Sequence, residues 1–257
     1  MPSEVRHRVD GGLTYPVVRL TGVLDTGSAP AVRSALLDIL GGQPEALVVD
    51  VRELSLDEPE AVTVLRDVAR AGAEWPGAPL VVCAAGDARA WHGLGLPTWS
   101  TPEEAFTALG DPAPDHFLST PLQPIVGAAR RSRELITEAC ARWELRDLAG
   151  PACIVVTEMV NNVVAHANTD MVVLLGLHGG TMTVAVRDRS PDVPRYSGEP
   201  VPVTSYGGRG LLLIDSVASR WGCLPVSDGK VVWAALAGDE EPAGDLRGTG
   251  MAGRSRG

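Results

Sequence analysis

Residues 157–167 read TEMVNNVVAHA, and this stretch decides how the second half of the chain folds. Glu158, Asn162 and His166 follow one another at a spacing of four residues, which places them on one face of a helix. The apolar positions expected to pack inward on the other side are Val155, Met159, Val163 and Ala167. A carboxylate and an amide on one helical face can orient a nucleophile and hold a hard cation. An amphipathic helix with a few polar residues accounts for the pattern equally well.

The use of asparagine favours a specific role for this helix. The chain has three asparagines in all, and they fall within eight residues of one another, at Asn161, Asn162 and Asn168. In a chain so poor in asparagine, such a cluster indicates a local chemical need.

Three further features follow along the chain. Asp188 ends a predicted strand in the segment VRDRSPDVP, and Tyr206–Gly210 (YGGRG) directly precedes an apolar helix. Glycines at a helix start allow backbone N–H groups to approach an anion, which the helix dipole also favours. Gly229-Lys230 then enters the last predicted strand. Taken singly, these features are typical of a turn residue, a flexible connector and an ordinary strand entry.

Apolar periodicity predicts the remaining elements. Continuous Val and Leu strands between helices indicate a sheet covered by helices in the first half. The second half reads as α+β, with helices over one mixed sheet. The strands are predicted at 15–21, 46–51, 80–85, 171–177, 181–187 and 230–236, and the helices at 29–40, 58–70, 102–109, 125–143, 151–167 and 210–221.

Composition limits the classes of function. The 257 residues carry a formal net charge of −10 and no dense Lys/Arg cluster, which argues against nucleic-acid binding. No run of about 18 apolar residues predicts a membrane helix, and the start lacks a signal-peptide core. The four cysteines are widely spaced in apolar settings and read as buried free thiols of a cytoplasmic protein.

Two segments interrupt the pattern. Residues 111–124 contain Pro112, Pro114, Pro121 and Pro124, and proline favours an extended linker. Residues 238–257 are rich in glycine and scattered charges and are expected to be disordered. This leaves a first domain over 1–110 and a second over 125–237.

The series of motifs in the second block resembles the GHKL ATP-binding (Bergerat) fold, in the short form of actinobacterial anti-sigma-factor serine kinases. The flanking segments AARRSRELITEACARWEL, GGRGLLLIDSVASRWG and GKVVWAAL agree with it. The resemblance implies an α/β sandwich that binds ATP and Mg²⁺. It implies Glu158 as general base and Asn162 as the Mg²⁺ ligand. It further implies that Asp188 accepts from the adenine amino group, and that Gly208 and Gly210 lie in the lid beside the phosphates.

Two positions depart from that family. Ser190 stands where the wider fold usually has glycine, two residues after the adenine aspartate. Val231 stands where relatives usually carry threonine after the Gly-Lys pair, which removes a hydroxyl expected near the adenine. Both changes are expected to weaken nucleotide binding.

The first block resembles a STAS domain, the fold of anti-sigma-factor antagonists. The segments that carry this resemblance are LTGVLDTGSA at 20–29 and ELSLDEPEAVTVL at 53–65. Antagonists carry a phosphorylatable serine at the start of the helix, and here Glu58 occupies that position. The acidic run is equally consistent with plain helix capping by Asp57, with Pro59 in the first turn.

Together the two resemblances imply an ATP-binding regulator of the anti-sigma-factor serine kinase type, which phosphorylates a serine of a separate antagonist. The expected partners are a sigma factor or a STAS-type antagonist, with no nucleic acid and no membrane. Regulators of this kind often dimerise, so a homodimer is one expected state. The alternative is a non-catalytic, ATP-gated interaction module in which the STAS-like block docks on the ATP domain. An unrelated enzyme using Glu158 and His166 as an acid–base pair is disfavoured, because eight helical residues separate the two groups by about 12 Å.

Overall fold

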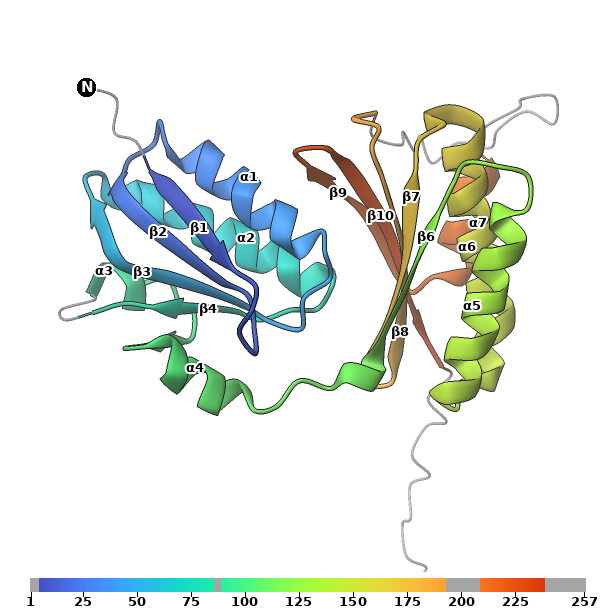
Figure 1. The fold of residues 1–257 in the computed structure, drawn as a ribbon, viewed down its shortest axis with the longest axis horizontal. Helices are drawn as coiled ribbons and strands as arrows, with labels where there is room; N and C mark the ends of the chain where they lie inside the picture. The colour runs from blue at the N-terminus through green and yellow to red at the C-terminus, as the bar shows by residue number, and fades with distance from the viewer. Residues whose placement is uncertain (1–4, 86–88, 193–208, 239–257) are drawn as a thin grey trace, which may run out of the picture.

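The chain folds around two five-stranded sheets (Figure 1), and the computed structural model describes residues 5–85, 89–192 and 209–238. The first sheet has the order β1-β2-β3-β4-β5, in which β1 is antiparallel to β2 and the remaining pairs are parallel. Its strands are β1 (Arg6–Asp10), β2 (Val17–Leu24), β3 (Leu47–Leu56), β4 (Leu80–Cys83) and β5 (Thr98–Trp99).

Helices cover both faces of the first sheet. Its helices are α1 (Ala29–Leu40), α2 (Thr63–Glu74), α3 (Arg89–His92) and α4 (Pro102–Leu109). The α1 and α2 side carries the larger core, whereas the other side packs a small cluster that includes Tyr15, Val48 and Ala105 of α4. The expectation of buried strands between helices is therefore correct, while the sequence pattern missed the short edge strands β1 and β5.

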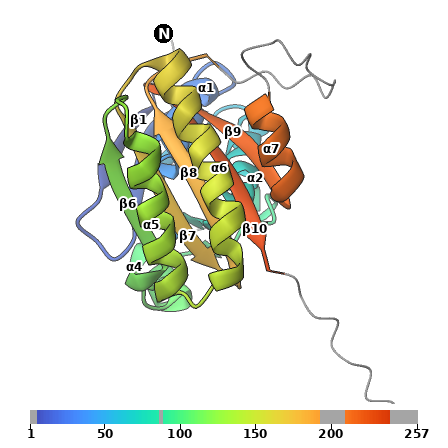
Figure 2. The same cartoon turned by 90° about the vertical axis from the view of Figure 1, so that its right-hand side faces the viewer.

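The second sheet has the order β6-β7-β8-β10-β9 and is antiparallel throughout. Its strands are β6 (Phe117–Leu122), β7 (Met171–His178), β8 (Thr181–Asp188), β9 (Arg220–Val226) and β10 (Gly229–Ala237). Helices α5 (Ala128–Arg142), α6 (Ala149–Asn162) and α7 (Arg209–Val217) lie side by side over one face (Figure 2). The α/β architecture is as expected, but the sheet is not mixed.

Two segments of the second sheet differ from the sequence prediction. Residues 117–122, expected to belong to the linker, form β6, which pairs along its length with β7. Pro121 is tolerated there because β6 is an edge strand whose outer side needs no ladder donor. The last helix ends at Val217, and Arg220–Val226 form β9. The expected tail, residues 238–257, lies outside the described residues beyond Gly238.

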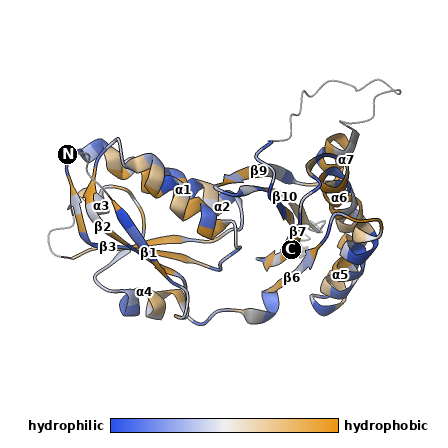
Figure 3. Cartoon of the chain, turned by 45° about the horizontal axis from the view of Figure 1, so that its top comes forward, coloured by the Kyte–Doolittle hydropathy of each residue, from blue (hydrophilic) through white to orange (hydrophobic). Residues whose placement is uncertain are grey.

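The outer face of the second sheet is covered by the first domain. Alternate residues of β7, β8, β9 and β10 point away from α5–α7 and join the core that α1 and α2 form with the first sheet. These second-domain members of the shared core are Leu174, Ala185, Leu224, Val231, Trp233 and Ala235. Figure 3 shows the apolar strands running through the interior of both halves. The two domains therefore share one hydrophobic core.

Polar contacts fix the position of the two domains. The backbone N–H of Ser227 donates to Asp38 Oδ1 at 2.6 Å, and the N–H of Ala113 donates to Glu45 Oε2 at 2.8 Å. Gln43, which has a left-handed backbone (φ 57), places its amide against Gly176. A Cβ at position 176 would lie 2.6 Å from Gln43 Nε2 and 2.8 Å from Thr183 Oγ1. Only glycine admits this approach.

One helical run within the described residues, Arg146–Ala167, is long and apolar enough to cross a membrane by composition alone. It is α6 with its flanking turns, and its apolar residues form the core between the helices and the second sheet. Core helices of soluble proteins commonly pass this test, and we assign no membrane span to it.

The four cysteines are free thiols, as expected. Cys83 and Cys140 are buried, whereas Cys153 and Cys223 are part-buried. Burial raises the pKa of the Cys83 thiol to about 12 and that of Cys223 to about 11. At neutral pH these side chains therefore stay protonated and serve as packing groups.

Candidate functional site

The helix that carries Glu158 and Asn162 is α6, and it ends in a wider turn than the sequence pattern predicts. The α-helix stops at Asn162, and Val163–Ala167 form a π turn that closes on Asn168 in the left-handed region (φ 49). Asparagine tolerates that conformation better than most residues. His166 lies within this π turn and is exposed. Of the inward set, Val155, Met159 and Val163 are buried as expected, and Ala167 is part-buried against the same core.

Gly210 brings the first turn of α7 against the polar face of α6. A Cβ at position 210 would lie 2.8 Å from Glu158 Oε2 and 3.7 Å from Asn162 Nδ2. A methyl group cannot be fitted at the first of these distances without displacing the carboxylate. Three of the predicted site residues thus meet at one point, and glycine is the residue that permits the contact. Both Glu158 and Asn162 are half-buried, so each retains access to solvent.

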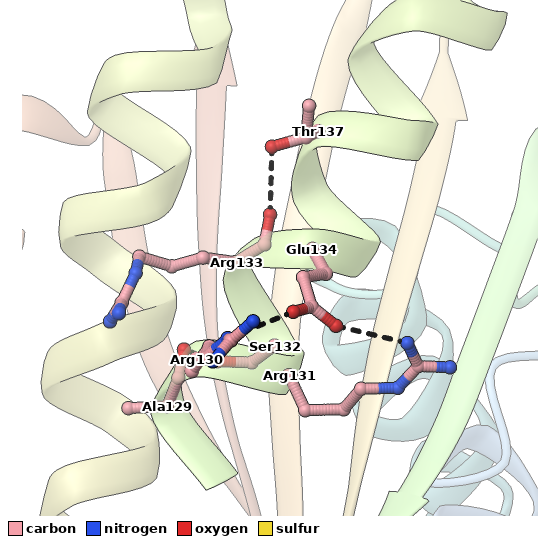
Figure 4. A network of polar contacts seen from close by, with 7 residues as sticks. All are labelled: Ala129, Arg130, Arg131, Ser132, Arg133, Glu134 and Thr137. Carbon is pink, nitrogen blue, oxygen red and sulfur yellow. Dashed lines mark hydrogen bonds and ion pairs between the residues drawn. The ribbon is translucent and has the colours of Figure 1, made fainter. Parts of the chain in front are cut away.

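The arginine-rich helix α5 contacts α6 at the residue before Glu158. Arg133 Nη1 donates to Thr157 Oγ1, beside Glu158, at 3.2 Å. Figure 4 shows the neighbouring arrangement on α5, where Glu134 accepts from both Arg130 and Arg131. Hydrogen bonds from Arg131 and then Arg130 lower the pKa of Glu134. These pairs neutralise charge on α5, while Arg133 remains directed toward α6.

Asp188 lies at the same end of the second domain as the C-terminal end of α6. The chain leaves the π turn at Ala167, enters β7 at Met171, and Met171 pairs directly with Asp188 at the end of β8. Asp188 is buried, with 2% of its surface exposed. Its Oδ1 accepts from the backbone N–H of Ser190 at 2.7 Å and from Lys230 Nζ at 2.8 Å.

Lys230, not Val231, faces Asp188. Residue 230 is the cross-strand partner of Asp188, and residue 231 points to the opposite face of the sheet because side chains alternate along a strand. Val231 is fully buried in the core shared with the first domain. The expectation that Val231 removes a hydroxyl near the adenine position is therefore wrong. From the sequence, Lys230 was noted only as part of the strand entry and was given no role in the site, although its being the chain's single lysine was a usable signal.

Gly229 closes this end of the sheet. A Cβ there would overlap the carbonyl of Asp188 and lie 2.7 Å from Arg189 Cα, so the backbones approach as closely as glycine allows. The approach holds the turn after Asp188 against the start of β10. Of the remaining predicted site residues, Gly208 lies outside the described residues. Within the described parts of the chain, no three His, Cys, Asp or Glu side chains form a metal-binding group.

In the first domain, Glu58 is half-buried and occupies the N-cap position ahead of the short 3₁₀ turn Pro59–Val62. Its carboxylate does not cap that turn. It accepts instead from the backbone N–H of Thr26 at 2.9 Å, and hydrogen bonds from Thr26 lower its pKa. The capping interpretation is correct for Pro59, which begins the turn, but the cap residue is Glu58 rather than Asp57.

Comparison with known proteins gives a family for the second domain. The histidine kinase-like ATPase domain matches residues 124–235. Those residues are a histidine kinase-like ATPase domain. The ATPase domain thus comprises β6–β10 with α5, α6 and α7, and it contains Glu158, Asn162, Asp188 and Gly210.

One curated relative supports a family assignment for the chain. An uncharacterized protein of Streptomyces coelicolor is 37% identical over 94 residues, which are 35% of this chain and 89% of the relative. The chain belongs to the same family as that protein.

The solved structures that match parts of this chain include two anti-sigma factor antagonists. One, from Mycobacterium paratuberculosis, is 24% identical over 42% of this chain and 96% of its own, with a TM-score of 0.36. SpoIIAA in its unphosphorylated form is 18% identical over 40% of this chain and 96% of its own, with a TM-score of 0.34. The RsbU and RsbW domains of a Mycobacterium tuberculosis protein are 21% identical over 47% of this chain and 31% of theirs, with a TM-score of 0.35.

Proposed function

We propose that this chain is an ATP-binding regulator of the anti-sigma-factor serine kinase type, which controls transcription through protein partners and phosphorylates a serine of a separate antagonist. The observation that carries the proposal is the meeting of Glu158, Asn162 and Gly210 between α6 and α7, at the end of the ATPase domain that also holds Asp188. The sequence spacing placed Glu158 and Asn162 on one helical face, but it did not require Gly210 to lie against them.

The donor set fits ATP and Mg²⁺. Gly210 lies directly against the Glu158 carboxylate, and Asn162 beside it carries a side-chain amide oxygen. Mg²⁺ is commonly held by one or two protein oxygens together with substrate phosphates. When bound, Mg·ATP supplies the phosphoryl group and the charge neutralisation that its transfer needs.

The chain's own residues have defined tasks in this proposal. Asn162 holds the cation, and Asp188 accepts a hydrogen bond from an exocyclic amine of the base. Glu158 accepts the proton of the attacking serine hydroxyl, and Gly210 lets the start of α7 approach the phosphates. The substrate serine belongs to another protein, because Glu58 occupies the equivalent position in this chain.

Calorimetric titration of Mg·ATP into wild type and Asn162→Ala tests the nucleotide site. Asn161→Ala is the matched control, since Asn161 is the neighbouring, exposed asparagine of the same helix. We expect binding to wild type and Asn161→Ala, and its loss or marked weakening in Asn162→Ala. Absence of binding to folded wild type would contradict the proposal.

The shared core favours a second candidate, a non-catalytic module in which ATP gates partner binding. In this reading the first domain, packed on the outer face of the ATPase sheet, is a resident partner. Glu158→Ala separates the two candidates. A kinase loses phosphoryl transfer to its antagonist while partner binding persists, whereas a module shows no transfer even as wild type. We further propose a cytoplasmic location and no nucleic-acid partner, in keeping with the net charge of −10.

A further inference from the structure

Lys230 and Asp188 form a buried ion pair at the end of the ATPase sheet, where β8 ends and β10 begins. Lys230 Nζ lies 2.8 Å from Asp188 Oδ1 and 3.1 Å from the carbonyl oxygen of Ser190. The two side chains are 8% and 2% exposed. Removing two charges from water is costly unless their remaining hydrogen-bonding positions are also used. We therefore expect every donor and acceptor of the pair to have a partner when the site is in use.

In the part of the chain that the structure describes, one N–H donor of Lys230 and one acceptor oxygen of Asp188 are unused. A lysine ammonium has three N–H donors, and two acceptors for them are found among the described residues, Asp188 Oδ1 and the Ser190 carbonyl. Asp188 Oδ1 already accepts from Lys230 and from the Ser190 N–H, whereas no described residue donates to Oδ2. One N–H of Lys230 and Oδ2 of Asp188 thus have no partner among the described residues.

We propose that Lys230 is a base-reading residue of the nucleotide site. Its third N–H donates to a ring nitrogen, while Asp188 Oδ2 accepts from the exocyclic amine next to that nitrogen. The inference rests on the proposed function, which places the base at Asp188. Adenine presents this edge, with the amino group on C6 as donor and N1 as acceptor. Guanine has a carbonyl and a protonated N1 in the same places, so its donor and acceptor are reversed.

The residue type suits this task. Lys230 is the chain's single lysine, and the other 21 of its 22 basic residues are arginines. A compact ammonium can serve three acceptors that lie in different directions, whereas the guanidinium of arginine presents its donors in one planar fork. Two protein acceptors and one ligand acceptor around Nζ therefore match lysine better than arginine.

The test compares ATP with 1-deaza-ATP, which keeps the amino group but replaces N1 by a carbon. Both are titrated with Mg²⁺ into the full-length wild type and into Lys230→Met. In wild type we expect 1-deaza-ATP to bind about ten- to a hundredfold more weakly than ATP, the usual range for a hydrogen bond from a charged donor. In Lys230→Met the two ligands should bind equally, because the donor to N1 is gone.

A second measurement does not depend on the variant being folded. Wild type grown with ¹⁵N-lysine carries one labelled side-chain nitrogen, which belongs to Lys230. Its NMR signal should shift on addition of Mg·ATP and shift less with 1-deaza-ATP at equal saturation.

The outcomes separate two failures. If wild type binds ATP and 1-deaza-ATP equally, or if Lys230→Met weakens both by the same factor, Lys230 only supports Asp188 and the inference is overturned. If folded wild type binds neither nucleotide, the proposed function fails and the inference fails with it.

Discussion

The indole of Trp233 lies across Gly222, its cross-strand partner on β9, so closely that a Cβ at position 222 would stand 2.8 Å from Trp233 Cζ2. The ring is 5% exposed and belongs to the core that the two domains share. Gly222 gives the indole room to lie along the outer face of the sheet. This pair shows how the ATPase sheet accommodates the helices of the first domain.

Trp233→Ala should destabilise the whole chain. Truncating a buried tryptophan typically costs about 3–5 kcal/mol, and here both halves of the shared core lose the contact. Chemical denaturation followed by circular dichroism measures the effect. Trp99→Ala is the matched control, because Trp99 is 37% exposed and should cost little. Equal losses for the two variants would show that the shared core contributes nothing.

Gly210→Ala should impair the nucleotide site while leaving the fold intact. The added methyl group would meet Glu158 Oε2 at 2.8 Å, so α7 or the carboxylate has to move. We expect Mg·ATP affinity to fall at least about tenfold, with little change in the melting temperature. Gly150→Ala is the control on α6, since nothing lies within 4 Å of its Cβ position. Unchanged affinity in Gly210→Ala would separate Gly210 from the site.

His178 should make stability depend on pH below neutrality. It lies at the domain boundary, with its ring near Gly77 and 5.2 Å from the Phe117 ring, and no described residue partners its buried Nδ1. Burial lowers its pKa, with a smaller opposing effect from Glu45 and a smaller reinforcing one from His116. Because the unfolded chain then binds the proton more readily, stability should fall as the pH drops below the unfolded value of about 6.5.

Urea unfolding at pH 7.5 and pH 5.5 measures this dependence. His178→Gln removes the titrating group, so its stability should change less between the two pH values than that of wild type. The same slope in both proteins would assign the pH dependence to other groups.

The first domain should accept no phosphate at the position of Glu58. Its carboxylate is held by Thr26, and the lowered pKa keeps it ionised even in mildly acidic solution. A glutamate carries about one negative charge where a phosphoserine carries about 1.5 to 2, so it resembles the modified state only in part. Radiolabelled ATP with a serine kinase of the anti-sigma-factor type should leave residues 50–65 unlabelled in the full-length chain.

Glu58→Ser is the positive control for that experiment, because it restores a hydroxyl at the helix start. Ser55→Ala removes the one natural serine within residues 50–65, which is exposed on β3. Label on residues 50–65 of wild type that disappears in Ser55→Ala would mean that this domain is itself a substrate.

The sequence predicted the helices and strands that have a strong apolar periodicity. It also predicted the site residues that meet at Gly210. The range Ala29–Leu40 was predicted at its observed bounds, and Glu158, Asn162 and Gly210 do meet. The strand β9 was missed because Arg220-Trp221-Gly222 continues the helical spacing of α7, and only its pairing with β10 makes it a strand. The local apolar pattern carries no information about this pairing, because β10 is a separate segment of the chain.

The sequence also could not predict which side chains of β10 face the site. The run GKVVWAAL indicates a strand buried on both sides, but not which residue faces Asp188. That depends on register, and the observed pairing of Lys230 with Asp188 turns Val231 toward the first domain. The sequence also could not predict that the first domain covers the outer face of the second sheet. Leu174 and Ala185 indicate only that an apolar surface packs over them.

The shared core also changes what a break in the chain would do. The connection from Leu109 to Phe117 is short and is not all that holds the halves in place, because Asp38 and Gln43 contact the second domain independently of it. A protease that cuts there should leave a nicked particle that still migrates as one species on gel filtration. The non-covalent contacts between the two domains would therefore keep them together after the peptide connection has been cut.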